Sequence, residues 1–217
     1  MYRKQLVLLG ILFSITLFLV AAWHYPGGSQ ADSHSIGYNW KTNYISNLFG
    51  EKAVNGSANA ARGWALGAMV FLALSFAHFF VDFAGKIPAK GAANVIRYVG
   101  VTSMLFTSLI ASPLHDLMIT IASTLFLISF FYITVFIIKS RLHLLKFLCV
   151  VWLLIFYATL YLYGSGDYRS YLPIMQKITF VSTIGLVIGL TYFTEKEDFQ
   201  PRFEGRSASI EEVESRQ

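Results

Sequence analysis

Three histidines and two aspartates are the residues of this chain whose types could do chemistry together. His24, Asp32 and His34 lie in one polar stretch, and His115 and Asp116 lie in a second, shorter one. Histidine nitrogens and carboxylate oxygens bind zinc, and a catalytic zinc site combines three such ligands with an open position for water. If the five side chains converge, they form a candidate zinc site in which His115 and Asp116 are the candidate catalytic residues.

The spacing of these residues leaves a simpler alternative open. No histidine pair has the i, i+4 spacing of a helical zinc motif. Ordinary histidines at a membrane surface explain each of them individually. The chain also lacks a Gly-x-Ser-x-Gly elbow, a Walker sequence, a Cys-x-x-Cys pair and a His-Glu-x-x-His motif. The sequence therefore names no reaction.

The long polar stretch contains a short segment with two different sides at helical spacing. One side is apolar: Trp40, Tyr44, Ile45, Leu48 and Phe49. The other side carries amides and a hydroxyl: Asn39, Asn43, Ser46 and Asn47. We predict a helix from an N-cap at Asn39 to a stop at Gly50, with its aromatic side on the membrane or the bundle. The amide side either binds a polar head group or only caps turns and meets water.

Lys177 is a further candidate ligand for an anionic head group. It lies close to the start of the last apolar run, beside Gln176. A lysine near a membrane interface usually extends its ammonium group to water, and this is the simpler explanation.

His78 and Asp82 form a pair within an apolar run. They are four residues apart, so they share one face of a helix and could relay a proton. However, Asp82 is expected about 27 Å along a helix that starts near Trp64, at the edge of the membrane. Contact with water or with Arg97 explains the carboxylate equally well.

The composition shows which elements must position these side chains. Hydrophobic residues make up 55% of the 217 residues and charged residues 13%, and the mean hydropathy is +0.56, whereas a soluble domain carries about 25% charged residues. Helices of about 20 apolar residues cross a bilayer. Six runs approach this length: 6–23, 64–83, 95–111, 117–138, 144–163 and 173–193. The first is too long for a signal peptide and lacks a small-residue cleavage site.

The sequence therefore predicts an all-α fold, a polytopic membrane bundle of six transmembrane helices over residues 1–194. A structured outer loop, residues 24–63, joins the first two helices. Residues 195–217 are charged and poor in aromatic residues, which predicts a disordered cytoplasmic tail. Gly185 and Gly189 form a Gly-x-x-x-Gly pair, which predicts close helix packing. The single cysteine, Cys149, excludes an intrachain disulfide.

The basic residues predict the orientation in a cell membrane. With a cytoplasmic N-terminus, twelve of the 17 lysines and arginines fall on the inner side. The positive-inside rule then places both termini in the cytoplasm and the long loop outside. The basic excess thus reports topology, and nucleic acid is not an expected partner. The outer side keeps five basic residues: Lys41, Lys52, Arg62, Arg169 and Lys177.

Part of the chain resembles a known family. The pattern comprises Tyr25-Pro26-Gly27-Gly28, Gly37-Tyr38, Asn43-Tyr44-Ile45-Ser46-Asn47-Leu48, Asn55-Gly56 and Arg62-Gly63-Trp64. It resembles the multi-pass prokaryotic membrane proteins of domain of unknown function family 998, whose first outer loop carries an Ile-Ser-x-Leu-Gly-like element. Here Phe49 separates Leu48 from Gly50, so this junction is one residue longer. The resemblance is best over the first loop and second span and weaker over residues 113–116. It implies about six spans and no settled biochemistry.

Two functions from different classes follow as hypotheses. The first is a non-enzymatic, carrier-like membrane protein that binds a lipid or small apolar ligand at the outer mouth of the bundle. The second is an intramembrane lipid hydrolase or transferase, zinc-dependent if the histidines and aspartates converge at the outer face. The enzyme needs at least three of those five side chains within ligand distance of one point. We expect the first function, because every histidine has an adequate structural explanation.

Overall fold

The fold is built from long helices that are apolar around their whole circumference. The computed structural model describes residues 2–112 and 114–200, and these residues form helices and loops without a strand. Met1, Pro113 and residues 201–217 lie outside the described part. Because lipid offers no hydrogen-bond partners, a helix is the element that satisfies the backbone of such a segment. Five helices are long and apolar enough to cross a membrane: α1 (Tyr2–Trp23), α2 (Arg62–Ala84), α5 (His115–Lys139), α6 (His143–Ser165) and α7 (Leu172–Tyr192).

The third predicted span is helical but divided. α3 (Lys90–Asn94), the π-helical segment η2 (Val95–Val99) and α4 (Gly100–Ser108) follow one another directly. None of the three is long enough by itself to cross a bilayer. The structure thus confirms an all-helical membrane bundle through five long helices, and the sixth crossing stays a prediction.

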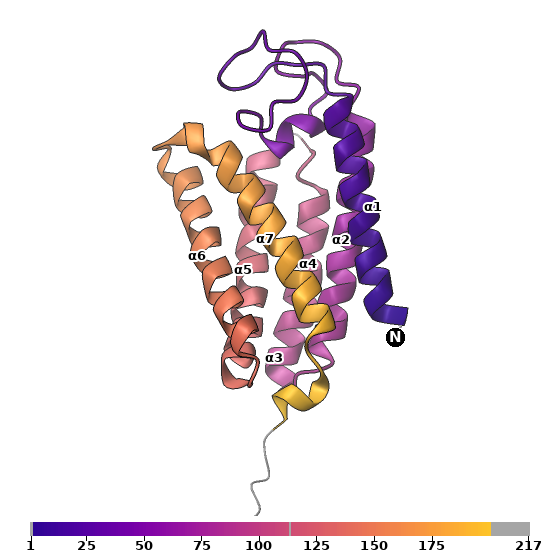
Figure 1. Ribbon diagram of the computed structural model, residues 1–217, viewed down its shortest axis with the longest axis vertical. Helices are drawn as coiled ribbons and strands as arrows, with labels where there is room; N and C mark the ends of the chain where they lie inside the picture. The colour runs from indigo at the N-terminus through magenta and orange to yellow at the C-terminus, as the bar shows by residue number, and fades with distance from the viewer. Residues whose placement is uncertain (1, 113, 201–217) are drawn as a thin grey trace, which may run out of the picture.

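The helices pack mainly on their neighbours in the chain. α1 lies on α2, α2 on α4, α4 on α5, α5 on α6 and α6 on α7, and α7 also contacts α1 and α2 (Figure 1). Aromatic rings fill the interior between α2, α5 and α6: Phe76, Phe79, Phe80, Phe126, Phe130, Trp152 and Phe156. The buried indole of Trp152 donates a hydrogen bond of 2.8 Å to Thr183 and so joins α6 to α7.

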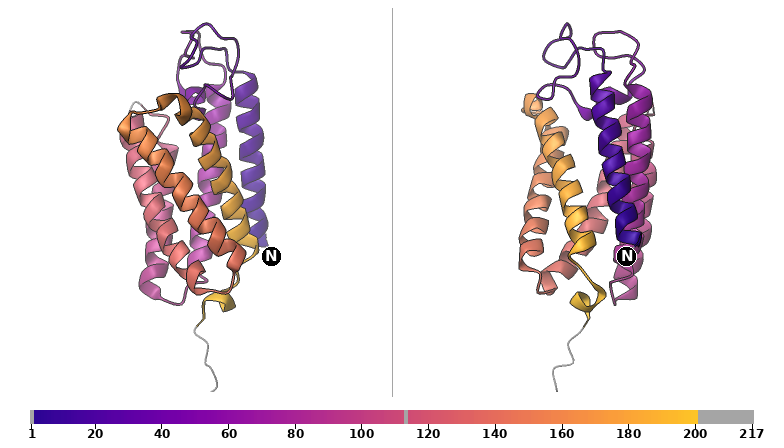
Figure 2. Two further views of the ribbon diagram at one scale, coloured as in Figure 1. Left: turned by 60° about the vertical axis from the view of Figure 1, so that its left-hand side comes forward. Right: turned by 45° about the vertical axis from the view of Figure 1, so that its right-hand side comes forward.

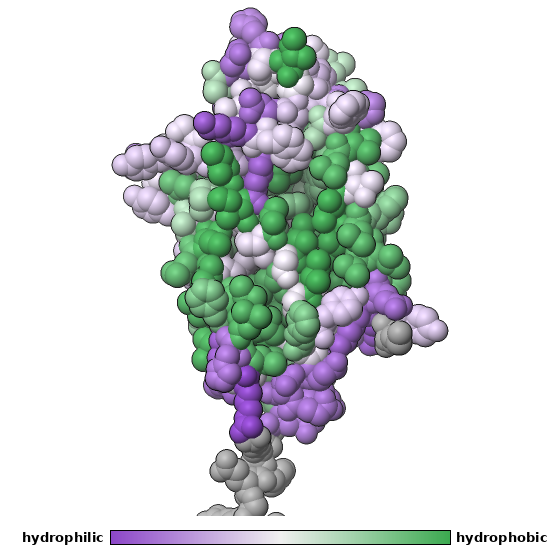
Figure 3. Space-filling view, in the orientation of Figure 1, coloured by the Kyte–Doolittle hydropathy of each residue, from purple (hydrophilic) through white to green (hydrophobic). Residues whose placement is uncertain are grey.

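The exterior of the bundle is an apolar band. Only 22 to 50% of the apolar window in each long helix is buried, so half or more of these side chains are at least partly exposed. Leu74, Leu154 and Val181 are 63%, 65% and 67% exposed, respectively. Figure 3 shows hydrophobic residues around the middle of the molecule and hydrophilic residues at both ends. Soluble monomers rarely expose such a continuous apolar surface, and a lipid bilayer is the environment that fits it.

The two ends of the bundle differ in what they carry. The loop between α1 and α2 lies at one end, which we call the loop end (Figures 1 and 2). The N-terminal turn and the end of α7 lie at the opposite end, the terminal end, where Lys4 donates a 2.5 Å hydrogen bond to Glu195. The start of α1 and the end of α7 therefore lie on the same side of the bundle.

The residues just after α7 are ordered, which corrects part of the prediction for the tail. A short 3-10 helix, η4 (Lys196–Phe199), follows α7, and its Phe199 is buried against Phe83 of α2 at 5.6 Å between ring centroids. Lys86 donates to the backbone carbonyl of Thr194, and burial lowers the pKa of this lysine. Phe199 and the bond between Lys4 and Glu195 thus hold the segment of residues 195–200, which the prediction of disorder missed. The rest of the tail lies outside the described residues.

Close helix contacts occur at glycines other than the predicted pair. A side chain at Gly10 would overlap Ser75 of α2, and a side chain at Gly100 would overlap the ring of Phe80. In contrast, open space surrounds the Cβ position of Gly185, and Gly189 makes only an ordinary contact. The prediction that the last helix packs closely through its Gly-x-x-x-Gly pair is therefore wrong.

Candidate ligand-binding site at the loop end

The loop between α1 and α2 folds over the bundle in tight turns. Gly27 and Gly28 have positive φ angles of 145° and 80°, which favour glycine. A Cβ atom on Gly28 would overlap the backbone of Asn55, so glycine also permits this close approach. The Val54 N–H donates to the Tyr25 hydroxyl at 3.0 Å, which ties the two parts of the loop together.

The predicted helix from Asn39 to Gly50 is only half formed. Residues 39–44 make turns in which the Asn39 side chain accepts hydrogen bonds from the N–H groups of Lys41 and Thr42. A 3-10 helix, η1 (Ile45–Phe49), occupies the second half. The helix prediction was therefore wrong for the first half, because an asparagine side chain competes with the helical hydrogen bonds of the backbone. Within η1, Phe49 is buried as predicted and meets Phe18 of α1.

The predicted amide face points into the loop itself. Asn43 is fully buried, and its Nδ2 donates to the Gly28 carbonyl at 2.7 Å while its Oδ1 accepts from the Asn39 N–H at 2.9 Å. The side chain of Asn47 accepts from the Tyr44 N–H at 2.7 Å. These amides hold the loop in shape, and the buried Asn43 does not meet water, which the simpler interpretation of the sequence expected of it. Ser46 lies half-buried in η1.

Asn59 is a structural residue that the sequence analysis missed. Its buried Nδ2 donates to three carbonyls, those of Asn47, Leu48 and Gly50, and its Oδ1 accepts from the Ala61 N–H. An asparagine shortly before the predicted span 64–83 was the available signal, since such positions favour caps. The three carbonyl partners could not be found from spacing alone.

Two residues of α7 dock the loop onto the bundle. Gln176 accepts a 2.8 Å hydrogen bond from the Ile45 N–H. Lys177 donates to the Asn43 carbonyl at 2.5 Å and to the Pro173 carbonyl at 3.0 Å. The ammonium also lies 5.6 Å from the centroid of the Tyr38 ring. The sequence singled out Lys177, and the structure adds the partners that surround it.

Among the described residues, the surroundings of Lys177 offer its ammonium no negative charge. Lys177 has no acidic partner within 4.0 Å in the described part of the chain. Tyr38, whose ring the ammonium faces, has a buried hydroxyl without a hydrogen-bond partner, and so has Thr42, next to Asn43. Burial raises the pKa of the Tyr38 phenol, so its hydroxyl stays protonated near neutral pH. A cation that faces Tyr38, whose hydroxyl has no hydrogen-bond partner, is an arrangement that suits an anionic oxygen.

The candidate zinc ligands of the loop are engaged separately. The His24 ring stacks on Trp64 at the start of α2, with ring centroids 6.2 Å apart. Asp32 accepts a 2.8 Å hydrogen bond from the His34 N–H, so its carboxylate closes a local turn. Within residues 2–112 and 114–200, no three His, Cys, Asp or Glu side chains are grouped so that they could hold a metal ion. The predicted convergence is therefore not formed, and we do not propose a zinc centre.

His115 and Asp116 begin α5 at the loop end. The His115 Nδ1 lies 3.6 Å from the Asp116 carboxylate, and this carboxylate accepts a 3.0 Å hydrogen bond from the Tyr163 hydroxyl. Tyr163, on α6, is a partner that the sequence analysis missed. The Asp116 side chain is 89% exposed, so water screens its charge. A structural link between α5 and α6 is the role that this geometry supports.

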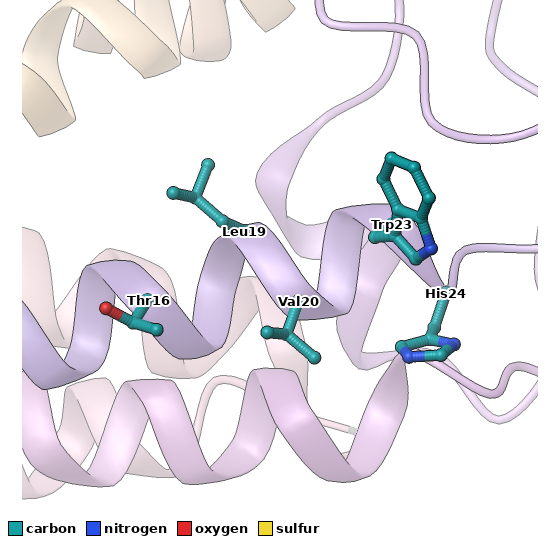
Figure 4. Close-up of a pocket in the computed structure, with 5 residues that line it drawn as sticks. All are labelled: Thr16, Leu19, Val20, Trp23 and His24. Carbon is teal, nitrogen blue, oxygen red and sulfur yellow. The ribbon is translucent and has the colours of Figure 1, made fainter.

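A shallow apolar groove of about 340 Å³ lies on α1 next to the loop end. Figure 4 shows its lining residues, with Leu19 and Trp23 projecting from one side of the helix and His24 at its end. Thr16 and Val20 complete the lining. The groove offers almost no polar group, so it suits a hydrocarbon chain better than a polar ligand.

Replacing Asn43 with alanine is expected to loosen the loop. The change leaves the Gly28 carbonyl and the Asn39 N–H without these partners. Gly28 is buried, and a buried unsatisfied group costs about 1–3 kcal/mol. Hydrogen exchange of amides in residues 25–60 should accelerate by about tenfold or more. The matched control is Asn55→Ala, because the exposed Asn55 side chain accepts one local hydrogen bond, from the Ser57 N–H. Unchanged exchange in Asn43→Ala would show that Asn43 does not hold the loop.

No family model, curated protein or solved structure matches the chain. The resemblance of the loop to domain of unknown function family 998 therefore stays a prediction.

Proposed function

We propose that this protein is a six-span integral membrane protein that binds an anionic lipid at the loop end, with Lys177 contacting the head group. The observation that carries the proposal is the ammonium of Lys177, which is partly buried and lacks a carboxylate partner in the described part of the chain. A desolvated charge is costly without an opposite charge. A phosphate or carboxylate head group supplies that charge and an acceptor for the Tyr38 hydroxyl.

The surroundings of Lys177 favour a lipid over a free anion. The lysine lies in the second turn of α7 and contacts the polar loop through the Asn43 carbonyl. Figure 3 shows that the hydrophobic surface gives way to hydrophilic residues towards this end of the molecule. Tryptophan and tyrosine side chains are enriched at the level of the lipid head groups. Such side chains are exposed around the loop end: Trp23, Trp64, Tyr161, Tyr168 and Tyr171. The site thus fits the depth at which a lipid head group lies.

The sixth crossing and the orientation belong to the same proposal. The contact between Lys4 and Glu195 brings both ends of the described chain to the terminal end, which requires an even number of crossings. The helical segment of residues 90–108 supplies the sixth. Basic side chains gather at the terminal end, so the positive-inside rule favours cytoplasmic termini and an outer loop in the cell membrane: Arg3, Lys4, Lys86, Lys90, Lys139, Arg141 and Lys196.

Lipid binding by detergent-purified protein tests the role of Lys177. The wild type is expected to bind phosphatidylglycerol about tenfold more tightly than phosphatidylcholine, because a hydrogen bond to a charged group contributes about 1.5–3 kcal/mol. The Lys177→Gln variant should lose most of this preference. Lys177→Arg should keep it, because the positive charge remains.

Lys41→Gln is the matched control, because it removes an exposed positive charge from the same loop. A preference that survives in Lys177→Gln contradicts the proposal. Competition by millimolar inorganic phosphate distinguishes the two sources of the anion. Displacement of the lipid by phosphate would identify a free-anion site, and resistance to phosphate supports a lipid site.

A further inference from the structure

A second groove, of about 510 Å³, lies between α1 and α2 towards the terminal end. Its floor is the close approach of Gly10 to Ser75. Its walls are apolar and outward-facing: Leu9, Phe13, Phe71 and Leu74. The groove lies within the apolar band that faces the bilayer, so lipid chains are the molecules that meet it there.

One residue of this groove does not suit a purely apolar surface. His78 lines the groove, and its Nε2 atom is buried without a hydrogen-bond partner. No hydrogen bond joins this imidazole to another residue in the described part of the chain. A neutral imidazole carries one N–H donor and one acceptor nitrogen. In an apolar environment such a group is costly unless a partner reaches it.

The groove ends at a charged pair at the edge of the membrane. Asp82 lies one helical turn beyond His78, and its carboxylate is 3.7 Å from the guanidinium of Arg3. The Arg3 side chain is 73% exposed, and its five N–H donors exceed what one carboxylate uses. Two other basic groups nearby already have partners, since Lys4 donates to Glu195 and Lys86 donates to Thr194. Arg3 is therefore the cationic partner for an additional anion at this edge of the membrane.

The order of these groups matches the order of groups in a phospholipid. From the edge inward the protein presents the Arg3 guanidinium, the His78 imidazole and the apolar walls of the groove. His78 lies about 6 Å deeper than Asp82 at the rise of an α-helix. A phospholipid presents a phosphate, then ester carbonyls a few bonds deeper, and then hydrocarbon chains.

We propose that this groove binds one ester-linked anionic phospholipid of the leaflet at the terminal end. Arg3 contacts the phosphate, His78 donates a hydrogen bond to an ester carbonyl, and one acyl chain lies over Gly10 between the walls. This site is separate from the site at Lys177, since it lies at the opposite end of α1 and α2 and uses other residues.

Replacing the ester linkage of the lipid with an ether isolates the role of His78. Native mass spectrometry of the full chain compares diester with diether phosphatidylglycerol, which share the same charge and chains. Wild type is expected to retain the diester about fivefold better, the effect of one hydrogen bond. His78→Phe should remove this difference, whereas Arg3→Gln should weaken both lipids alike.

Two controls make the result specific. Arg141→Gln removes another exposed charge at the terminal end and should leave both lipids unaffected. Lys177→Gln should leave the difference in retention between the diester and the diether lipid intact. A loss of binding at the loop end is thereby distinguished from a loss of binding in this groove. An equal affinity of the wild type for the two lipids overturns the proposal. A diester preference that persists in a folded His78→Phe variant also overturns it.

Discussion

The Gly100→Ala variant is expected to unfold with a free energy about 2 kcal/mol or more below that of the wild type. In the structure a Cβ atom at Gly100 would overlap the ring of Phe80, a fully buried residue of α2. Overpacking of this kind typically costs about 1–3 kcal/mol, because side chains leave their rotamers and helices shift. Phe80 touches Phe126 and Phe130 of α5, so it cannot move without disturbing the aromatic core.

The matched control is Gly185→Ala on α7. The Cβ position of Gly185 is open, so the variant gains only helix propensity, about 1 kcal/mol or less. Reversible unfolding of both variants in mixed detergent micelles measures the two free energies. Equal stabilities of the two variants would show that α4 does not approach α2 as closely as described.

The helices could be predicted from hydropathy because lipid forces apolar segments into helices. The predicted run 117–138 corresponds to α5 (His115–Lys139), and the run 144–163 corresponds to α6 (His143–Ser165). The same pattern did not show the π-helical segment η2 within the third run, since one wider turn leaves the composition unchanged. Hydropathy also did not show which glycines meet a neighbouring helix, because that depends on the rotation of each helix.

The loop shows where prediction from local spacing stops. The spacing of Leu48 and Phe49 correctly placed a helix in the second half of the segment, and both side chains are buried. Asn43 instead turns inward, because its partners are the Gly28 carbonyl and, through its own carbonyl, Lys177. Lys177 lies 134 residues further along the chain, and spacing carries no information about such a contact.

The candidate metal ligands illustrate the same limit for a site. Their residue types fit zinc chemistry, but a ligand set also needs side chains that point to one place. His24 stacks on Trp64, and the Asp32 carboxylate bonds the backbone next to it. These local partners, which the sequence allowed as the simpler explanation, account for both residues.

The topology of the protein is the claim on which the site at the loop end depends. Labelling of single introduced cysteines with a membrane-impermeant maleimide in intact cells tests it, and the buried Cys149 makes the wild type a suitable blank. Three exposed positions serve as reporters. Ser33 reports on the loop, Leu114 on the end of the third helical segment, and Lys90 on the opposite side of the bundle.

The proposed topology predicts that Ser33→Cys and Leu114→Cys react in intact cells, whereas Lys90→Cys reacts only after permeabilisation. Leu114 is the decisive position, because it lies outside only if residues 90–108 cross the membrane. Labelling of Ser33→Cys together with a protected Leu114→Cys would contradict the sixth crossing. Labelling of Lys90→Cys alone in intact cells would reverse the orientation and place the Lys177 site on the cytoplasmic side.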